Sequence, residues 1–227
     1  NILGFDEDGN IIIDPKCAVG ILEEFKKKYP DYNVTATFFL NKGLFNGRTH
    51  EELKIKWLVE NGYEVANHTY NHTPLDKVSY EKVEEEIGKI EQLLESIVPG
   101  RHLQVLAKPN GSLTDPNHAN FPALKSGSYN GVPYKMQAAL NIGKWFSRSI
   151  YDEKIDIYNI PRIRATNEAN DEINWGAPPE IIDNAFASYK DSRYVSDGNQ
   201  DTIVFPEYSP HTLNKEKFKD KYILRYE

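Results

Sequence analysis

Two histidines four positions apart, His68 and His72, are residues whose type and spacing could bind a metal ion. Zinc takes imidazole nitrogens at about 2.0–2.1 Å, so both rings have to reach one point. The pair follows the apolar run 63–66, which the turn residues Asn61 and Gly62 precede, and this run predicts a short strand. Four residues of extended chain span about 13 Å, whereas residues i and i+4 of a helical turn lie on one face. If the two rings share an ion, we therefore expect the chain to leave the strand and coil at once.

The residues around the pair are compatible with such a turn. Asn67 could cap it, since asparagine is a favoured N-cap residue. Pro74 predicts that the turn is short, because proline disrupts a helix that continues through it. The alternative is a pair of solvated loop histidines, and the spacing by itself leaves both interpretations open.

Two further stretches precede the histidines in a specific order. Residues 34–40 read Val-Thr-Ala-Thr-Phe-Phe-Leu, and residues 61–67 read Asn-Gly-Tyr-Glu-Val-Ala-Asn and lead directly into His68. In order and spacing they resemble the polysaccharide deacetylase domain of carbohydrate esterase family 4. In that family a strand ending in Ala-Thr-Phe-Phe precedes a Gly-x-Glu-x-x-Asn-His-(Ser/Thr)-x-x-His metal motif. The resemblance is best between residues 17 and 111.

The resemblance implies a fold, a cofactor and a reaction. The fold is a distorted (β/α) barrel with fewer than eight strands, formed by a single polysaccharide-deacetylase-like domain over residues 1–227. The cofactor is a divalent metal, usually zinc, with His68 and His72 as ligands. The reaction removes N-acetyl groups from an amino-sugar polysaccharide, peptidoglycan or a chitin-like polymer, at an extracellular or cell-surface location. In such chemistry a metal acidifies its bound water, a carboxylate takes the proton, and an acid protonates the departing amine.

The first motif of the family, Thr-Phe-Asp-Asp, supplies the base and the third metal ligand. Here only the run 4–9, Gly-Phe-Asp-Glu-Asp-Gly, resembles it, with a disrupted spacing. Either Asp6 and Asp8 do this work from a degenerate motif, or the true motif lies upstream of Asn1. We favour the second interpretation, because the acidic run is typical of a hairpin turn and the segment before Thr37 exceeds the family's usual spacing.

The third motif of the family is a substrate-binding loop that follows an arginine. Pro109, Asn110 and Gly111 echo this loop without the arginine. Lys108 is a different kind of cation at that place, because an ammonium group cannot make the planar contacts of a guanidinium. A simple Pro-Asn-Gly turn is an equal alternative.

The last two motifs are weaker still. Candidates for the fourth, which lines the pocket, are Asp156 with Tyr158, and Trp175. The fifth motif supplies an acid histidine on the last strand of the family fold. The comparable run 203–207 has no histidine, and His211 lies further along the chain.

Charge and composition narrow the possible partners. The chain has 227 residues and a formal net charge of −7, which argues against a nucleic-acid partner and an anionic membrane surface. It has no apolar run of membrane-spanning length. Arg162 and Arg164 could bind an acidic group, although solvated surface arginines are the commoner case. Cys17 is the single cysteine, so no internal disulfide can form.

Strand and helix patterns alternate in the first half of the chain, which predicts a parallel sheet with a site at the carboxyl ends of its strands. One helix is expected to run from Ser79 to Ile97 with an apolar stripe on one face and a solvated face at 84–86. The other expected elements are a hairpin over 2–13, a helix opened by Asp14, a strand over 34–40, a helix opened by a Thr49 capping box, and strands over 63–66 and 103–107.

Three functional hypotheses follow. The first is a metal-dependent polysaccharide deacetylase, supported by the histidine motif and the strand before it. The second is a catalytically impaired relative that acts as a metal- or glycan-binding module, supported by the incomplete first motif and the missing acid histidine. The third, ranked last, is a structural or partner-binding domain with two incidental histidines.

Overall fold

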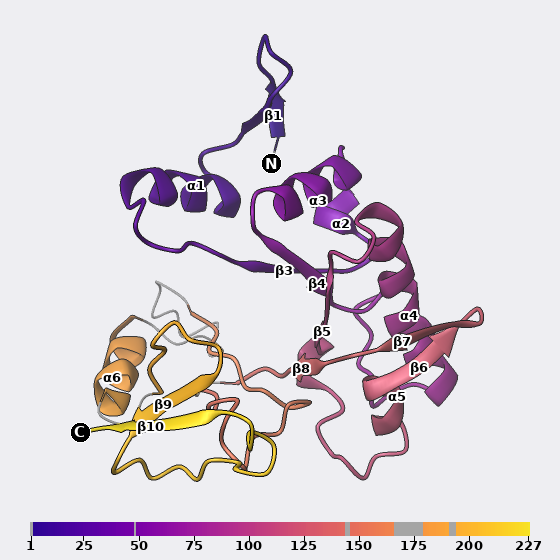
Figure 1. Cartoon of the computed structure of the whole chain (residues 1–227). Coiled ribbons are helices and arrows are strands. Elements are labelled where there is room, and N and C mark those ends of the chain that lie inside the picture. The colour runs from indigo at the N-terminus through magenta and orange to yellow at the C-terminus, as the bar shows by residue number, and fades with distance from the viewer. Residues whose placement is uncertain (1, 48, 144–145, 166–178, 191–193) are drawn as a thin grey trace.

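A parallel β-sheet forms the centre of the protein (Figure 1). The computed structural model describes residues 2–47, 49–143, 146–165, 179–190 and 194–227. The sheet has four strands, in the order β3 (Thr37–Leu40), β4 (Glu64–Asn67), β5 (Leu103–Ala107) and β8 (Ala138–Leu140). All of their pairings are parallel. Beyond β8, Ile160 and Ile163 form single parallel bridges to Leu140 and Gly143, so an extended segment continues the sheet on that side.

The predicted α/β architecture with a parallel sheet is confirmed, whereas closure into a barrel is not tested by the described strands. The last strands, β9 (Thr202–Pro206) and β10 (Tyr222–Tyr226), form a separate parallel pair. In Figure 1 this pair lies at the lower left, beside α6 (Pro179–Tyr189). A distorted barrel with fewer than eight strands therefore stays a prediction.

Helices and two hairpins surround the sheet. Crossovers through α3 and α4 connect successive parallel strands, as parallel pairing requires. None of the helices in the described ranges is long and apolar enough to cross a membrane. The remaining elements are α1 (Ala18–Lys28), α2 (Leu44–Gly47), α3 (Glu51–Glu60), α4 (Tyr80–Ile97), the 3₁₀ turn η1 (Pro109–Gly111), α5 (Phe121–Lys125), and the hairpins β1 (Ile2–Phe5) with β2 (Ile11–Ile13) and β6 (Ser126–Tyr129) with β7 (Val132–Lys135).

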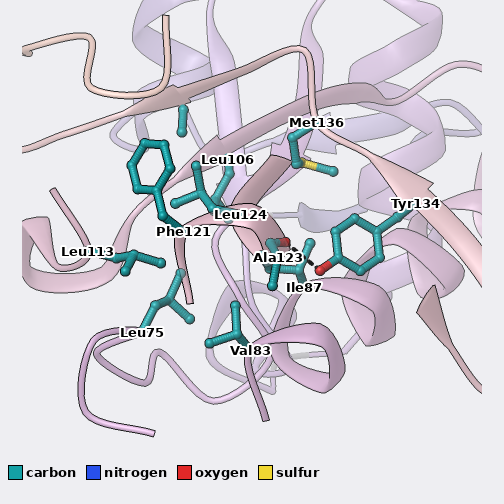
Figure 2. Close-up of a cluster of buried hydrophobic side chains, with 11 residues drawn as sticks. Leu75, Val83, Ile87, Leu106, Leu113, Phe121, Ala123, Leu124, Tyr134 and Met136 are labelled. Carbon is teal, nitrogen blue, oxygen red and sulfur yellow. Dashed lines mark hydrogen bonds between the residues drawn. The ribbon is translucent and has the colours of Figure 1, made fainter. Parts of the chain in front are cut away.

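Helix α4 organises the core. Ser79 caps it as predicted, with its hydroxyl accepting from the Lys82 amide at 3.3 Å. Figure 2 shows that Val83 and Ile87 pack with residues of β5 and α5 in one buried cluster, beside which the Tyr134 hydroxyl donates to the Ala123 carbonyl. The rest of the stripe packs in a second buried cluster against α3, β3 and β4, with Ile90, Leu94 and Ile97. Burial of each such side chain contributes about 1.5–3 kcal/mol. Because residues of α4 take part in both clusters, this one helix packs against both halves of the sheet.

Two predicted helix starts were wrong. Helix α1 is capped by Cys17, whose Sγ accepts from the Gly20 amide at 3.4 Å, because Asp14 instead closes a local turn on the Lys16 amide. Helix α3 begins after His50, which has a left-handed φ of 66° and makes no side-chain cap bond, so the expected capping box does not form.

Candidate metal and substrate site

The rings of His68 and His72 lie together, the arrangement that a shared metal ion would require. His68 is the first residue after β4, and the two ring centroids lie 4.7 Å apart with planes at 79°. This edge-to-face arrangement places two imidazoles where their nitrogens can approach a common point. His68 is half-buried and His72 is exposed, so the pair lies at the surface end of the strand with its rings in contact.

The chain reaches this geometry without the expected helical turn, which was wrong. Residues 68–73 form no helix, and Thr69 and His72 have left-handed φ angles of 63° and 58°. The Asn67 Oδ1 atom accepts from the Thr69 amide at 2.8 Å, which makes a side-chain turn of the kind asparagine favours. Left-handed backbone is unfavourable for residues other than glycine, so surrounding contacts have to hold this loop.

Helix α4 holds the loop from behind through two carboxylates. Asn67 Nδ2 donates to Glu91 Oε1 at 2.8 Å and to the Ile87 carbonyl at 3.0 Å. The carboxylate of Glu86 accepts from both the backbone amide and the side-chain amide of Asn71 at 2.6 Å. Glu86 is completely buried, so the predicted solvated face at 84–86 was wrong for this residue.

One histidine is also fixed in its tautomer. His68 Nδ1 lies 2.7 Å from the Ala107 carbonyl oxygen, which can only accept, so Nδ1 carries the proton and Nε2 keeps its lone pair. Burial lowers the pKa of His68 against the opposing effect of this hydrogen bond, and the nearby His72 and Arg162 lower it further. A neutral, oriented imidazole is the form that binds metal.

The histidines open into a cavity of about 450 Å³ at the carboxyl ends of the strands. Parallel sheets commonly place their sites at this edge, because the loops after neighbouring strands meet there. The cavity is lined by His68, His72, Lys108, Asn110, Ile142, Arg162, Ile163 and Arg164.

The two imidazoles fit part of a zinc site. Imidazole nitrogen is a preferred zinc donor, and the anchored His68 ring is typical of such ligands. Within the described ranges no group of three or more His, Cys, Asp or Glu side chains could hold a metal ion. The described residues therefore supply two zinc donors and no carboxylate beside them.

Asp6, the candidate base, lies elsewhere. It sits in the turn of the β1–β2 hairpin, which Figure 1 shows projecting from the top of the molecule, and it does not line the histidine cavity. Its carboxylate accepts from the Asn10 side chain and from the amides of Asn10 and Asp8, bonds that lower its pKa. In this structure the Asp6 oxygens close a local turn away from the cavity, and the role of Asp6 as base stays a prediction.

The candidate loop 109–111 contributes one side chain to the lining of the histidine cavity. Only Asn110 lines the cavity, whereas Pro109 is buried and Gly111 continues the turn. Asn110 and Gly111 have left-handed φ angles of 51° and 63°, so the Pro-Asn-Gly turn is real. The substrate-binding assignment of these residues stays a prediction, carried by Asn110.

Of the other motif candidates, those that the structure describes do not line the cavity. Asp156 accepts from the Tyr158 amide at 2.9 Å and from Asn159 Nδ2 at 2.7 Å, and neither it nor Tyr158 is a lining residue. Trp175 lies outside the described residues. His211 lines a different cavity, where its Nδ1 is 3.1 Å from Asp152 Oδ2.

The structure buries two cations of the cavity wall, Lys108 and Arg162, more deeply than the sequence indicated. Lys108 is fully buried, and its ammonium donates to the carbonyls of Leu113 and Tyr158 and to Asn159 Oδ1. Arg162 is half-buried rather than a surface arginine, and its Nε donates to the Asn141 carbonyl at 2.9 Å. The signal available for Arg162 was its position directly after Pro161, in the extended segment that continues the sheet.

Lys108 gives a testable pH dependence. Burial lowers its pKa to about 8, partly opposed by the charge of Asp156. Above that pKa the unfolded chain keeps a proton that the folded protein has lost, so stability should rise by up to about 1.4 kcal/mol per pH unit towards pH 10. Urea unfolding at about pH 7.5, 8.5 and 9.5 should show this rise in the natural protein and in the exposed-site control Lys217→Met, and not in Lys108→Met. Parallel curves for the two variants would contradict it.

Comparison with known proteins identifies the family to which this site is related. A model of the polysaccharide deacetylase family matches residues 20–122. The Streptococcus pyogenes deacetylase PplD in complex with acetate is similar at 15% identity and a TM-score of 0.51, over 74% of this chain and 65% of that one. The proposed polysaccharide deacetylase BA0330 of Bacillus anthracis is similar at 18% identity and a TM-score of 0.54, over 74% and 46%. BA3943, a CE4 family pseudoenzyme from Bacillus anthracis, matches at 28% identity and a TM-score of 0.34, over 42% and 31%.

These matches support a polysaccharide deacetylase domain in this chain, so the recognition made from its motifs is confirmed. The likeness to PplD and BA0330 shows the fold. The chain spans 65% and 46% of those two structures, less than two thirds of either. Metal, polymer and activity are therefore matters for the proposal that follows.

Proposed function

We propose that this domain removes N-acetyl groups from an amino-sugar polysaccharide, peptidoglycan or a chitin-like polymer, with a divalent metal, zinc in the first place. The converging pair of His68 and His72 carries the proposal, because imidazole nitrogens are preferred zinc donors and these two rings lie together at one strand end. Polymers of this class lie outside the cell, so we place the protein extracellularly or at the cell surface.

The residues of the site have separable tasks in this proposal. When bound, the metal supplies an acidified water and polarises the amide carbonyl. His68 is held in the ligating tautomer by Ala107, and the Asn67 turn presents His72 beside it. Asn110 faces the same cavity and can hydrogen-bond a sugar amide or hydroxyl.

The experiment is acetate release from N-acetylated chito-oligomers and from peptidoglycan, measured after loading with zinc or cobalt and again after chelation. We expect release that depends on added metal and is lost in His68→Ala and His72→Ala. The exposed-histidine variant His50→Asn is the control, since asparagine tolerates the left-handed backbone found there. No release with any metal or polymer would count against the proposal.

A second candidate function is a relative that binds metal or glycan without turnover. It is favoured by one observation: no Asp or Glu of the described residues lines the histidine cavity, so the proton acceptor for water is missing there. Oligosaccharide binding that persists in the His68→Ala, His72→Ala double variant, without acetate release by the parent, would favour this candidate over the first.

A further inference from the structure

The histidine cavity has an unbalanced charge. The Lys, Arg, Asp and Glu side chains among its described lining residues are all basic: Lys108, Arg162 and Arg164. The whole chain has a formal net charge of −7, so this local excess runs against the balance of the protein. A concave surface of one charge sign focuses its potential on ligands of the opposite sign.

Arg162 is placed to contact such a ligand directly. Its Nε is used by the Asn141 carbonyl at 2.9 Å, which fixes the guanidinium in the cavity wall. In the described part of the chain no carboxylate pairs with its two terminal nitrogens, which leaves a pair of parallel donors. It lies close enough to the histidines for its charge to act on His68.

Lys108 adds charge rather than contact. Its ammonium points to the Leu113 and Tyr158 carbonyls and to Asn159, so its hydrogen bonds are already made inside the protein. Planar two-point recognition of a carboxylate is a property of the guanidinium group, and Arg162 is the half-buried one in this wall.

We propose that Arg162 binds a carboxylate beside the histidine pair, so that the domain prefers a carboxylate-bearing acetylated amino sugar to a neutral one. This inference rests on the proposed function and names the substrate class of the same site. The same chemistry could hold the acetate that deacetylation releases. The substrate carboxylate and the released acetate would both contact Arg162, and the experiment distinguishes the two.

The test compares an oligosaccharide containing N-acetylmuramic acid with its methyl ester, which has the same shape and no charge. Affinities are measured by calorimetry at low salt with metal-loaded protein. We expect the acid to bind at least about 10-fold more tightly than the ester, as for a charge-assisted hydrogen-bond pair. Arg162→Gln should remove this preference, and Arg162→Lys should keep only part of it.

The control is Arg101→Gln, which removes an exposed arginine that donates to the Val59 carbonyl and does not line the histidine cavity, and it should leave the preference unchanged. Equal affinities of acid and ester, with acetate competing in the natural protein and not in Arg162→Gln, would assign the contact to the product. Equal affinities without acetate competition, or a preference that survives Arg162→Gln, would overturn the carboxylate site.

Acetate release from neutral chito-oligomers keeps the two proposals apart. Release without any carboxylate preference would leave the deacetylase function standing and remove this inference. A carboxylate preference without acetate release from any substrate would leave the carboxylate site standing and count against the deacetylase function.

Discussion

Replacing both His68 and His72 by alanine should lower the zinc affinity of the protein by about 100-fold or more. Loss of a partner that merely orients a metal ligand already costs about 10–100-fold, and here the ligands themselves are removed. The effect should be nearly as large in either single variant, because one imidazole cannot hold zinc against water. Competition with a chromophoric chelator at about pH 7.5 measures it, where neutral imidazoles predominate.

The matched control is again His50→Asn, which removes an exposed imidazole far along the chain from the pair. Circular dichroism of the double variant should remain that of the folded protein, since both rings border a cavity and not the core. A double variant that is folded and keeps its zinc affinity would show that the pair is not a metal site.

Much of the fold could be read from local patterns. The stripe on α4 predicted five buried positions because a helix that covers a sheet repeats its apolar residues on one face, and all five are buried: Val83, Ile87, Ile90, Leu94 and Ile97. The motif around His68 and His72 favoured a shared site for the two rings, although the helical turn expected to bring them together does not form. In each case the signal lies within a short stretch of chain.

Other features depend on residues that are distant in sequence. Glu86 is surrounded by glutamates in the helix pattern, and only the Asn71 loop folding over it makes it buried. Arg162 lines the cavity because its segment lies beside β8, a pairing of residues 140 and 160 that no local pattern encodes. Helix starts were ambiguous for a different reason, since a side chain such as Asp14 can either cap a helix or close a local turn.

Replacing Glu86 by alanine should destabilise the fold by about 1.5–3 kcal/mol, the range for hydrogen bonds to a charged group. The carboxylate is completely buried and accepts from both amides of Asn71, and it lies 3.3 Å from the Lys82 ammonium. Removing it takes the charged acceptor from both amides of the exposed Asn71, in a loop that already contains left-handed backbone, and it empties a completely buried position on the helix. For a domain of this size we expect the melting temperature to fall by about 3–12 °C.

Glu85 provides the control in the same helix. It pairs with Lys82 and Lys89 at the surface, where its side chain is 29% exposed, so Glu85→Gln should cost less than about 1 kcal/mol. Glu86→Gln keeps one acceptor oxygen and should fall between the two, which gives a soluble variant if alanine is not tolerated.

The zinc affinity of the histidine pair should also fall when Glu86 is replaced. Asn71 directly precedes His72, so a loop released from Glu86 no longer holds that ring against His68. We therefore expect zinc affinity in folded Glu86→Gln to fall by about 10-fold or more, as for the loss of an orienting partner, and to be unchanged in Glu85→Gln. Equal stability and equal zinc affinity in the two glutamine variants would mean that the loop holds its own shape. The histidine pair would then be preorganised by the Asn67 turn alone.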